Sequence, residues 1–391
     1  MKSPLVSRLF HWTVVALLAL ATIELAFRLV LFPGWTALQQ DMHVAHPVFD
    51  FYTRPNLDVR RLKPGNWDVR VHTNALGLRG RPDEMAADLA GLWFVGDSNT
   101  FGGYLDDDDV FVARLAKAGL RSANLANEGH DMVQQARVLR WLIGQDKRPR
   151  AVMAVVSLYH GVRPYQDAPA ALARPATAFA AQPKPRPHAV ELLRGGVERL
   201  GQLPASGQEL RALLGGTSAT YGWLKSGIMG VPGLRDLTLR LGLRTDLDLV
   251  YPFELDLLRP MAEGNPALAE IRATASLLAA MAELVKRELG VPFGVLVLPG
   301  NHQVYPTAFA RWQASAGRSG EDLDPLRVMH ALEAEVAARG LPVLDVLEPL
   351  RAAPVRVIFP DDGHLNAEGH RIVAEALAGW LPKALGTEPR P

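Results

Sequence analysis

The sequence predicts an α/β fold built on a parallel sheet. Short apolar runs alternate with helix-like stretches over residues 91–163, and the alternation resumes over residues 266–385. Parallel strands need a crossover connection, which is usually a helix, so this alternation is typical of a parallel sheet. The 391-residue chain is long enough for a sizeable core, and an apolar fraction of 48% excludes a wholly disordered chain.

Composition excludes several classes of function. The chain carries 42 basic and 41 acidic residues, so it lacks the basic excess expected of a nucleic-acid-binding protein. It contains no cysteine, which excludes disulfides, iron–sulfur clusters and thiolate zinc sites. We therefore expect no nucleic-acid partner.

Residues 1–33 are expected to form an N-terminal membrane anchor. The stretch 9–32 is mostly apolar, and as a transmembrane helix it would span about 36 Å, enough to cross a bilayer. Lys2 and Arg8 precede it, which predicts a cytoplasmic N-terminus and an extracytoplasmic location for the rest of the chain. Two alternatives stay open: a signal peptide cleaved near Ala21, which would release a secreted protein, and a helix buried in a soluble protein.

Residues 34–90 are expected to form a lead-in segment that packs on the α/β domain. Turn signals such as Pro64-Gly65 divide this segment, and alternating pieces such as 68–71 predict edge strands or hairpins. Residues 91–163 then form the first half of the α/β domain. Strands are predicted at 92–95, 121–125 and 151–159, and helices at 109–118 and 131–144.

Residues 164–265 are expected to form a proline-rich linker and a largely helical insertion or cap, since 164–187 contain six prolines. The second half of the α/β domain covers 266–385. Asn265 is a predicted helix cap before Pro266. This half predicts a helix from 266, strands at 291–299 and 341–347, and helices at 325–339 and 367–382.

Ser98 is the first candidate for a reactive residue. The apolar run 92–95 stops at Gly96-Asp97-Ser98, which places a serine where a parallel strand ends. Open α/β sheets build their sites at the carboxyl ends of strands, where a sharp turn can expose a hydroxyl beside backbone N–H groups. The alternative is an ordinary turn, in which aspartate and serine are common.

Asp361 and His364 form the second candidate pair. They lie three residues apart, just before the last predicted helix, for which Asn366 is the expected cap. A carboxylate beside an imidazole fixes its tautomer and stabilises the imidazolium during proton transfer. Two alternatives are a capped helix start with solvated acids and a metal site that adds Asp362 and His370.

Three further stretches carry polar residues near predicted strand ends. Asn124 ends a short apolar run, and Gly129 in the following loop can offer an N–H to a substrate oxygen. His302 follows the strand 291–299 and is a candidate substrate contact, with an ordinary loop histidine as the alternative. Asp106 to Asp109 are expected to be a solvated helix start.

Together these blocks resemble the SGNH (GDSL) hydrolase family. Gly96-Asp97-Ser98, Asn124 with Gly129, and Asp361-x-x-His364 occur in the family's order. The resemblance covers about 91–163 and 290–382. Upstream, "TRPNLDVR" (53–60) and "TNALGLRG" (73–80) look like the lead-in of a bacterial, membrane-anchored branch linked to polysaccharide O-acylation and deacylation.

The resemblance implies a three-layer α/β/α, flavodoxin-like fold and a serine triad without metal or cofactor. Ser98 would be the nucleophile, His364 the general base and Asp361 the residue that orients it. The backbone N–H groups of Ser98 and Gly129 would form part of the oxyanion hole. One block departs from the family: its asparagine donor after the third strand is absent here, and His160 or Arg163 is the candidate substitute.

These expectations define an ester hydrolase in the bacterial inner membrane, with its catalytic domain on the periplasmic side. The expected substrate is an acyl ester, in particular an acetyl ester, of cell-envelope polysaccharide. One alternative is an O-acyltransferase that uses the same triad with a membrane acyl-donor partner. The other is a catalytically inactive glycan-binding module.

Overall fold

We describe the protein from a computed structural model. The structure describes residues 4–31, 42–46, 48–63, 67–81, 83, 88–145, 147–158, 220–221, 223–224, 255–315, 317–359 and 363–387. The described residues fall into two compact units. The first contains the N-terminal helix, and the second contains the α/β domain together with most of the lead-in segment.

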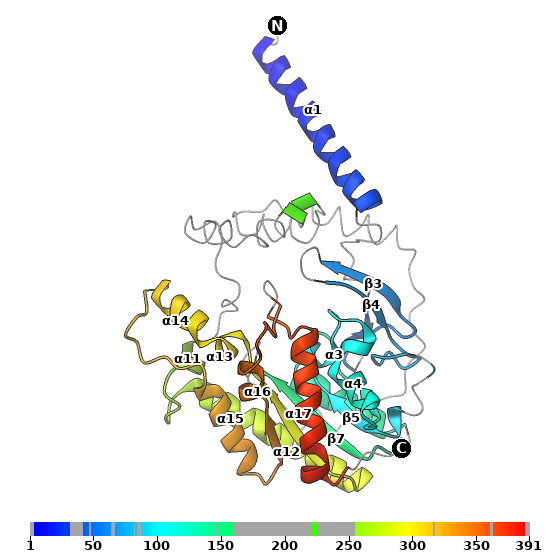
Figure 1. Cartoon of the computed structure of the whole chain (residues 1–391), viewed down its shortest axis with the longest axis vertical. Helices are drawn as coiled ribbons and strands as arrows, with labels where there is room; N and C mark the ends of the chain where they lie inside the picture. Colours follow the sequence, from blue (N-terminus) through cyan, green and yellow to red (C-terminus); the bar gives the residue numbers. More distant parts are fainter. Residues whose placement is uncertain are drawn as a thin grey trace. The chain divides into compact units, whose positions relative to one another are not determined.

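The N-terminal helix α1 (Pro4–Ala26) continues into a π-helical turn, η1 (Phe27–Leu31) (Figure 1). Glu24 accepts a hydrogen bond from the backbone N–H of Thr220 at 3.1 Å, and the rings of Phe27 and Trp223 meet edge to face at 5.3 Å. Among the residues that the structure describes, no helix has both the length and the apolar character needed to cross a membrane.

The α/β domain contains a five-stranded sheet in the order β6-β5-β7-β8-β9. The strands are β5 (Leu92–Val95), β6 (Ser122–Asn124), β7 (Ala151–Ser157), β8 (Phe293–Leu298) and β9 (Val343–Asp345). All neighbouring strands are parallel. Numbered from β5, the order is 2-1-3-4-5, that of flavodoxin-like doubly wound sheets. The predicted α/β class and parallel sheet are therefore confirmed.

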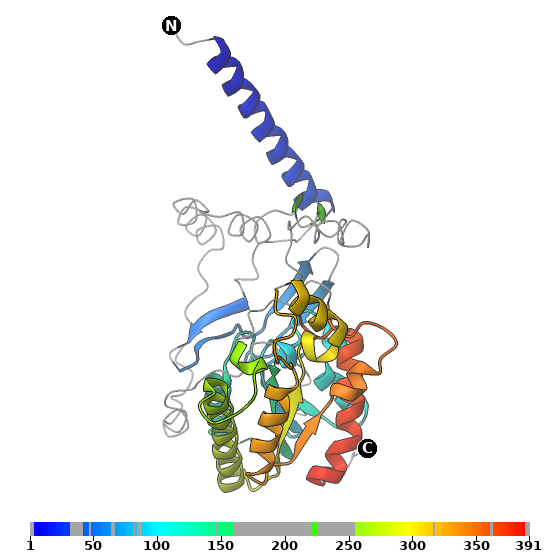
Figure 2. The ribbon, with the colours of Figure 1, turned by 90° about the vertical axis from the view of Figure 1, so that its left-hand side faces the viewer.

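Helices cover both faces of this sheet. Contacts link α5 (Met132–Ile143), α12 (Pro266–Leu289) and α15 (Arg327–Ala337) into one group, and α4 (Phe111–Lys117) with α17 (Ala367–Leu385) into another. Figure 2 shows α12 and α17 on opposite sides of the strands. All seven residues of β7 are buried, as expected for a strand covered on both faces.

This unit contains further, mostly short helices among the described residues. They are α3 (Ser98–Phe101), η3 (Asp107–Asp109), α11 (Leu255–Leu258), α13 (Asn301–Val304), α14 (Pro306–Ser315) and α16 (Leu347–Arg351). Of the insertion expected over 164–265, most lies outside the described residues, so its helical character stays a prediction.

The lead-in segment forms two small two-stranded sheets. Strand β1 (His43–His46) pairs antiparallel with β2 (Asp50–Thr53), and β3 (Asp58–Lys63) forms a second sheet with β4 (Trp67–His72). An apolar cluster joins this segment to the helix that begins at Ser98. Its buried members are Met42, Leu57 and Val71 from the lead-in segment, and Phe101 and Ala126 from the α/β domain.

Candidate active site

Ser98 and His364 lie side by side although 266 residues separate them in the chain. Ser98 Oγ is 2.7 Å from His364 Nε2, and the two residues are 4% and 7% exposed. The hydroxyl donates to Nε2 when the imidazole carries its proton on Nδ1. This is the contact that a general base needs in order to take a proton from a serine.

The fold places Ser98 at the topological switch point of the sheet. Ser98 begins α3, three residues after the end of β5, and β5 has β6 on one side and β7 on the other. Ligands of doubly wound sheets bind at the carboxyl ends of the strands at such a point. The position expected for Ser98 from the sequence is the one observed.

The two residues that flank Ser98 fix the turn in which it lies. Asp97 caps α3 by accepting the N–H of Asn99 at 3.0 Å, and its Oδ1 also accepts from Ser157 Oγ at 2.8 Å. Asn99 Oδ1 accepts the backbone N–H of Leu365 at 3.1 Å, which connects α3 directly to the loop that carries His364.

His364 lies in a short loop that is fixed at both ends. Its carbonyl accepts from Phe359 N–H at 2.9 Å. Asn366 caps α17 by accepting the N–H groups of Glu368 and Gly369, each at 3.0 Å, and thus confirms the predicted cap. Asp361 lies outside the described residues, so its role as the orienting carboxylate stays a prediction.

The loop after β6 approaches the nucleophile turn. Asn124 Nδ2 donates to the carbonyl of Thr100 at 2.7 Å, and Asn127 N–H donates to the carbonyl of Gly96 at 3.3 Å. Gly129, further along this loop, is exposed and has φ +78°, a conformation that favours glycine. The structure thus places the predicted loop against the turn that carries Ser98, and the oxyanion role of Gly129 stays a prediction.

A buried ion pair lies beside these loops. Arg61, on β3, is 2.5 Å from Glu128 Oε1 and also donates to the carbonyl of Gly103 at 2.7 Å. Its guanidinium lies 4.8 Å from the centre of the Tyr104 ring, and that ring lies 4.2 Å from the ring of His364, centre to centre. Sequence reasoning missed all three side chains, because no local pattern marks them.

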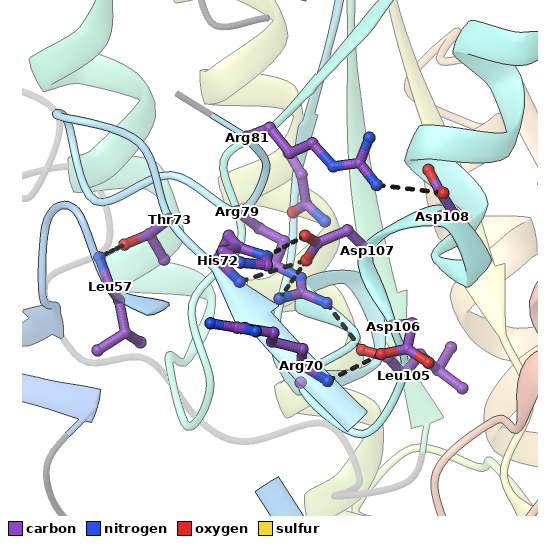
Figure 3. Close-up of polar contacts among 12 residues, drawn as sticks. Leu57, Arg70, His72, Thr73, Arg79, Arg81, Leu105, Asp106, Asp107 and Asp108 are labelled. Atoms are coloured by element: carbon purple, nitrogen blue, oxygen red, sulfur yellow. Dashed lines mark hydrogen bonds and ion pairs between the residues drawn. The ribbon is translucent and has the colours of Figure 1, made fainter. Parts of the chain in front are cut away.

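The acidic stretch after α3 begins a helix, as the sequence predicts, and Asp106 and Asp108 are exposed, but Asp107 is not solvated. Figure 3 shows Asp107 contacted by both His72 and Arg79. Asp107 Oδ1 is 2.8 Å from Arg79 Nη1, and the two side chains are 10% and 2% exposed. Burial lowers the pKa of Arg79 to about 10, and Asp107 partly offsets this effect by favouring the charged guanidinium. Asp107 thus holds the lead-in segment instead of facing water.

His370 and His302, considered as a metal ligand and a substrate contact, are both buried. His370 Nδ1 accepts from the backbone N–H of Phe111 at 3.1 Å, and desolvation lowers the pKa of His370 to about 3. His302 lies at the start of α13, after β8, and desolvation lowers its pKa to about 3 as well. Within the described ranges, no three histidine, aspartate or glutamate side chains are grouped so as to hold a metal ion. Asp362, His160 and Arg163 lie outside these ranges.

Comparison with known proteins adds no functional assignment. No protein-family model matches the chain, and no curated protein matches it. One solved crystal structure is similar to it at 13% sequence identity, with a TM-score of 0.35, over 76% of this chain and 99% of the other. A likeness at this level carries no argument about function.

Proposed function

We propose that the protein is a serine ester hydrolase of the SGNH type. The observation that carries the proposal is the 2.7 Å contact between Ser98 Oγ and His364 Nε2 at the carboxyl edge of a parallel sheet. A buried serine beside a buried imidazole has the geometry of an activated nucleophile. The strand order and the position of Ser98 directly after β5 support the same assignment.

The proposed reaction has two halves. Ser98 Oγ attacks the ester carbonyl while its proton passes to His364 Nε2, and the backbone N–H groups of Ser98 and Gly129 donate to the resulting oxyanion. His364 then protonates the leaving alcohol, which leaves an acyl group on Ser98. Water, deprotonated by His364, releases the acid and restores the serine. Asp361 is the proposed orienting carboxylate, and His160 or Arg163 the proposed further oxyanion donor.

We further propose an acyl ester of a carbohydrate, in particular an acetyl ester, as the substrate. Its support is the order of sequence blocks and the lead-in segments 53–60 and 73–80. In the structure the first segment runs into β3 and the second follows β4, within the lead-in segment that packs on Phe101 of α3. A location on the periplasmic side of the inner membrane stays a prediction from the sequence, to be tested by cell fractionation.

The full-length protein and its Ser98→Ala variant test the reaction. Both are treated with a serine-reactive fluorophosphonate, and hydrolysis of a chromogenic acetyl ester is followed. We expect labelling and turnover in the parent and neither in the variant. Labelling with negligible hydrolysis, but with acyl transfer to added glycan, would identify an O-acyltransferase instead. If the folded parent is not labelled, and if the parent and Ser98→Ala bind glycan equally strongly, the protein is an inactive binding module.

A further inference from the structure

Three side chains from separate parts of the chain form a continuous series of contacts that ends on His364. Arg61 comes from β3, Tyr104 from the loop after α3, and Glu128 from the loop after β6. The guanidinium carbon of Arg61 is 4.8 Å from the centre of the Tyr104 ring. The imidazole of His364 is 4.2 Å from the same centre, with the two planes tilted by 37°. The guanidinium and the imidazole therefore both contact the Tyr104 ring.

Arg61 is itself held firmly in place. It is 5% exposed, and it contacts Glu128 Oε1 at 2.5 Å and the carbonyl of Gly103 at 2.7 Å. Separating a buried pair of opposite charges leaves each charge without compensation, so the pair is expected to stay together. Position 103 also leaves room for the pair, because a Cβ there would lie 2.0 Å from Glu128 Oε1 and 2.3 Å from Arg61 Nη1.

We propose that Tyr104 is a positioning residue for His364 and that the Arg61–Glu128 pair holds Tyr104 in position. The inference rests on the proposed function, in which His364 is the base. A ring packed on an imidazole limits its rotation, which keeps Nε2 within hydrogen-bond distance of Ser98 Oγ. When Nε2 takes the serine proton, the imidazole becomes a cation, and an aromatic ring face stabilises a nearby cation. Glu128 balances the charge of Arg61 beside that cation.

The rate constant for fluorophosphonate labelling of Ser98 in the full-length protein tests this role. We expect Tyr104→Leu to slow labelling about tenfold, because small misplacements of catalytic groups have effects of this order or larger. Tyr104→Phe keeps the ring and is expected to restore most of that loss. A merely structural role for the side chain would not produce such a difference at equal thermal stability.

The role of Arg61 is tested by asking whether the effects of Arg61 and Tyr104 substitutions on the labelling rate add. We expect Arg61→Met to slow labelling, and the double variant Arg61→Met/Tyr104→Leu to be no slower than Tyr104→Leu alone, since Arg61 acts through Tyr104. Arg60→Met is the matched control. Arg60 is the neighbouring residue on β3, is exposed, and pairs with Asp68 at 2.6 Å, so its loss is expected to leave labelling unchanged.

The outcomes separate this inference from the proposed function. If the parent is not labelled at Ser98, the proposed function fails and the inference fails with it. If the parent is labelled and Tyr104→Leu reacts equally fast, the inference alone is overturned. If the effects of Arg61→Met and Tyr104→Leu add, Arg61 does not act through Tyr104. If Tyr104→Leu does not fold, Arg61→Lys is the deciding variant, because it keeps the charge but loses the planar group over Tyr104. An unchanged labelling rate in Arg61→Lys would then overturn the inference.

Discussion

The two proposed reacting side chains, Ser98 and His364, are held in position by neighbouring residues that take no part in the proposed reaction. Asp97 fixes the turn from β5 by contacts with Asn99 and Ser157, and Asn99 in turn holds Leu365, next to His364. Each contact uses a buried group, so its loss would leave a polar atom unsatisfied. The position of the hydroxyl relative to the imidazole is thus determined by Asp97 and Asn99, which flank Ser98, and by the contact of Asn99 with Leu365.

Replacing glycine by alanine is expected to have opposite effects on stability at two positions. Gly103→Ala would place a Cβ 2.0 Å from Glu128 Oε1, so we expect the free energy of unfolding to fall by about 1–3 kcal/mol. Gly379→Ala is the control, because Gly379 lies inside α17 and nothing lies within 4 Å of its Cβ position. That change should raise the free energy of unfolding by about 0.5–1 kcal/mol. Urea denaturation measures both, and equal effects would contradict the close approach at Gly103.

The burial of His370 predicts a pH dependence of stability. Desolvation lowers the pKa of His370 to about 3, whereas an unfolded histidine titrates near 6.5. Between these values the unfolded chain binds the proton and the folded protein does not, so the free energy of unfolding falls as the pH falls below about 6.5. Between pH 6 and pH 4, we expect the free energy of unfolding of His370→Gln to fall by about 2 kcal/mol less than that of the parent.

Denaturant unfolding of both proteins across this pH range makes the measurement. The comparison concerns the slope with pH, because His370→Gln also changes the acceptor for Phe111 N–H and so affects stability at every pH. Parallel pH curves for the two proteins would show that His370 is protonated in the folded protein.

At the scale of elements, the loops at strand ends bring the site together. The turn after β5 carries Ser98, and the loop after β6 carries Gly129. The loop that leads into α17 carries His364. The bounds of α17 therefore matter for the site as well as for stability. Asn366 both caps this helix and donates from Nδ2 to the carbonyl of Arg356 at 2.8 Å.

The caps of the two longest helices of the α/β domain provide a matched pair of variants. Asn366→Ala and Asn265→Ala each remove a side chain that accepts from the first turn, of α17 and α12 respectively, and each should cost about 1 kcal/mol of stability. Only Asn366 lies beside the loop of His364, so only Asn366→Ala should also slow fluorophosphonate labelling. Equal labelling rates in the two variants would show that the cap does not help to position the base.

The sequence predicts elements better than it predicts the surroundings of the site. The helix from Pro266 and its Asn265 cap follow from local spacing and are observed, as is the serine after β5. Arg61, Tyr104 and Glu128 could not be predicted together, because each makes its contact with a residue distant in the chain. Asp107 was predicted to be solvated for the same reason: the acidic run is visible locally, but Arg79 and His72 are not.

At the scale of the whole molecule, the strand order determines which strands are most protected. Strands β5, β7 and β8 each have two neighbours, and their residues are buried throughout. Among the described residues, strand β9 pairs only with β8, and none of its three residues is fully buried. Local opening requires less free energy where fewer buried contacts are broken.

This difference predicts the pattern of amide hydrogen exchange. Peptides covering β5, β7 and β8 should exchange slowest, and the peptide covering 343–345 should exchange faster than all three. Mass spectrometry of the full-length protein over minutes to hours gives the comparison. Protection of β9 equal to that of β7 would indicate that further chain covers this edge of the sheet.

The long separation between Ser98 and His364 has a consequence for the protein during its synthesis. A nascent chain emerges from the ribosome at about 5–20 residues per second. Because Ser98 precedes His364 by 266 residues, His364 emerges roughly 13–53 s after Ser98. In the proposed mechanism, the serine has no base until His364, in the loop before α17, has reached it. Reactivity of Ser98 therefore reports the last stage of folding, and labelling of stalled nascent chains of increasing length would time it.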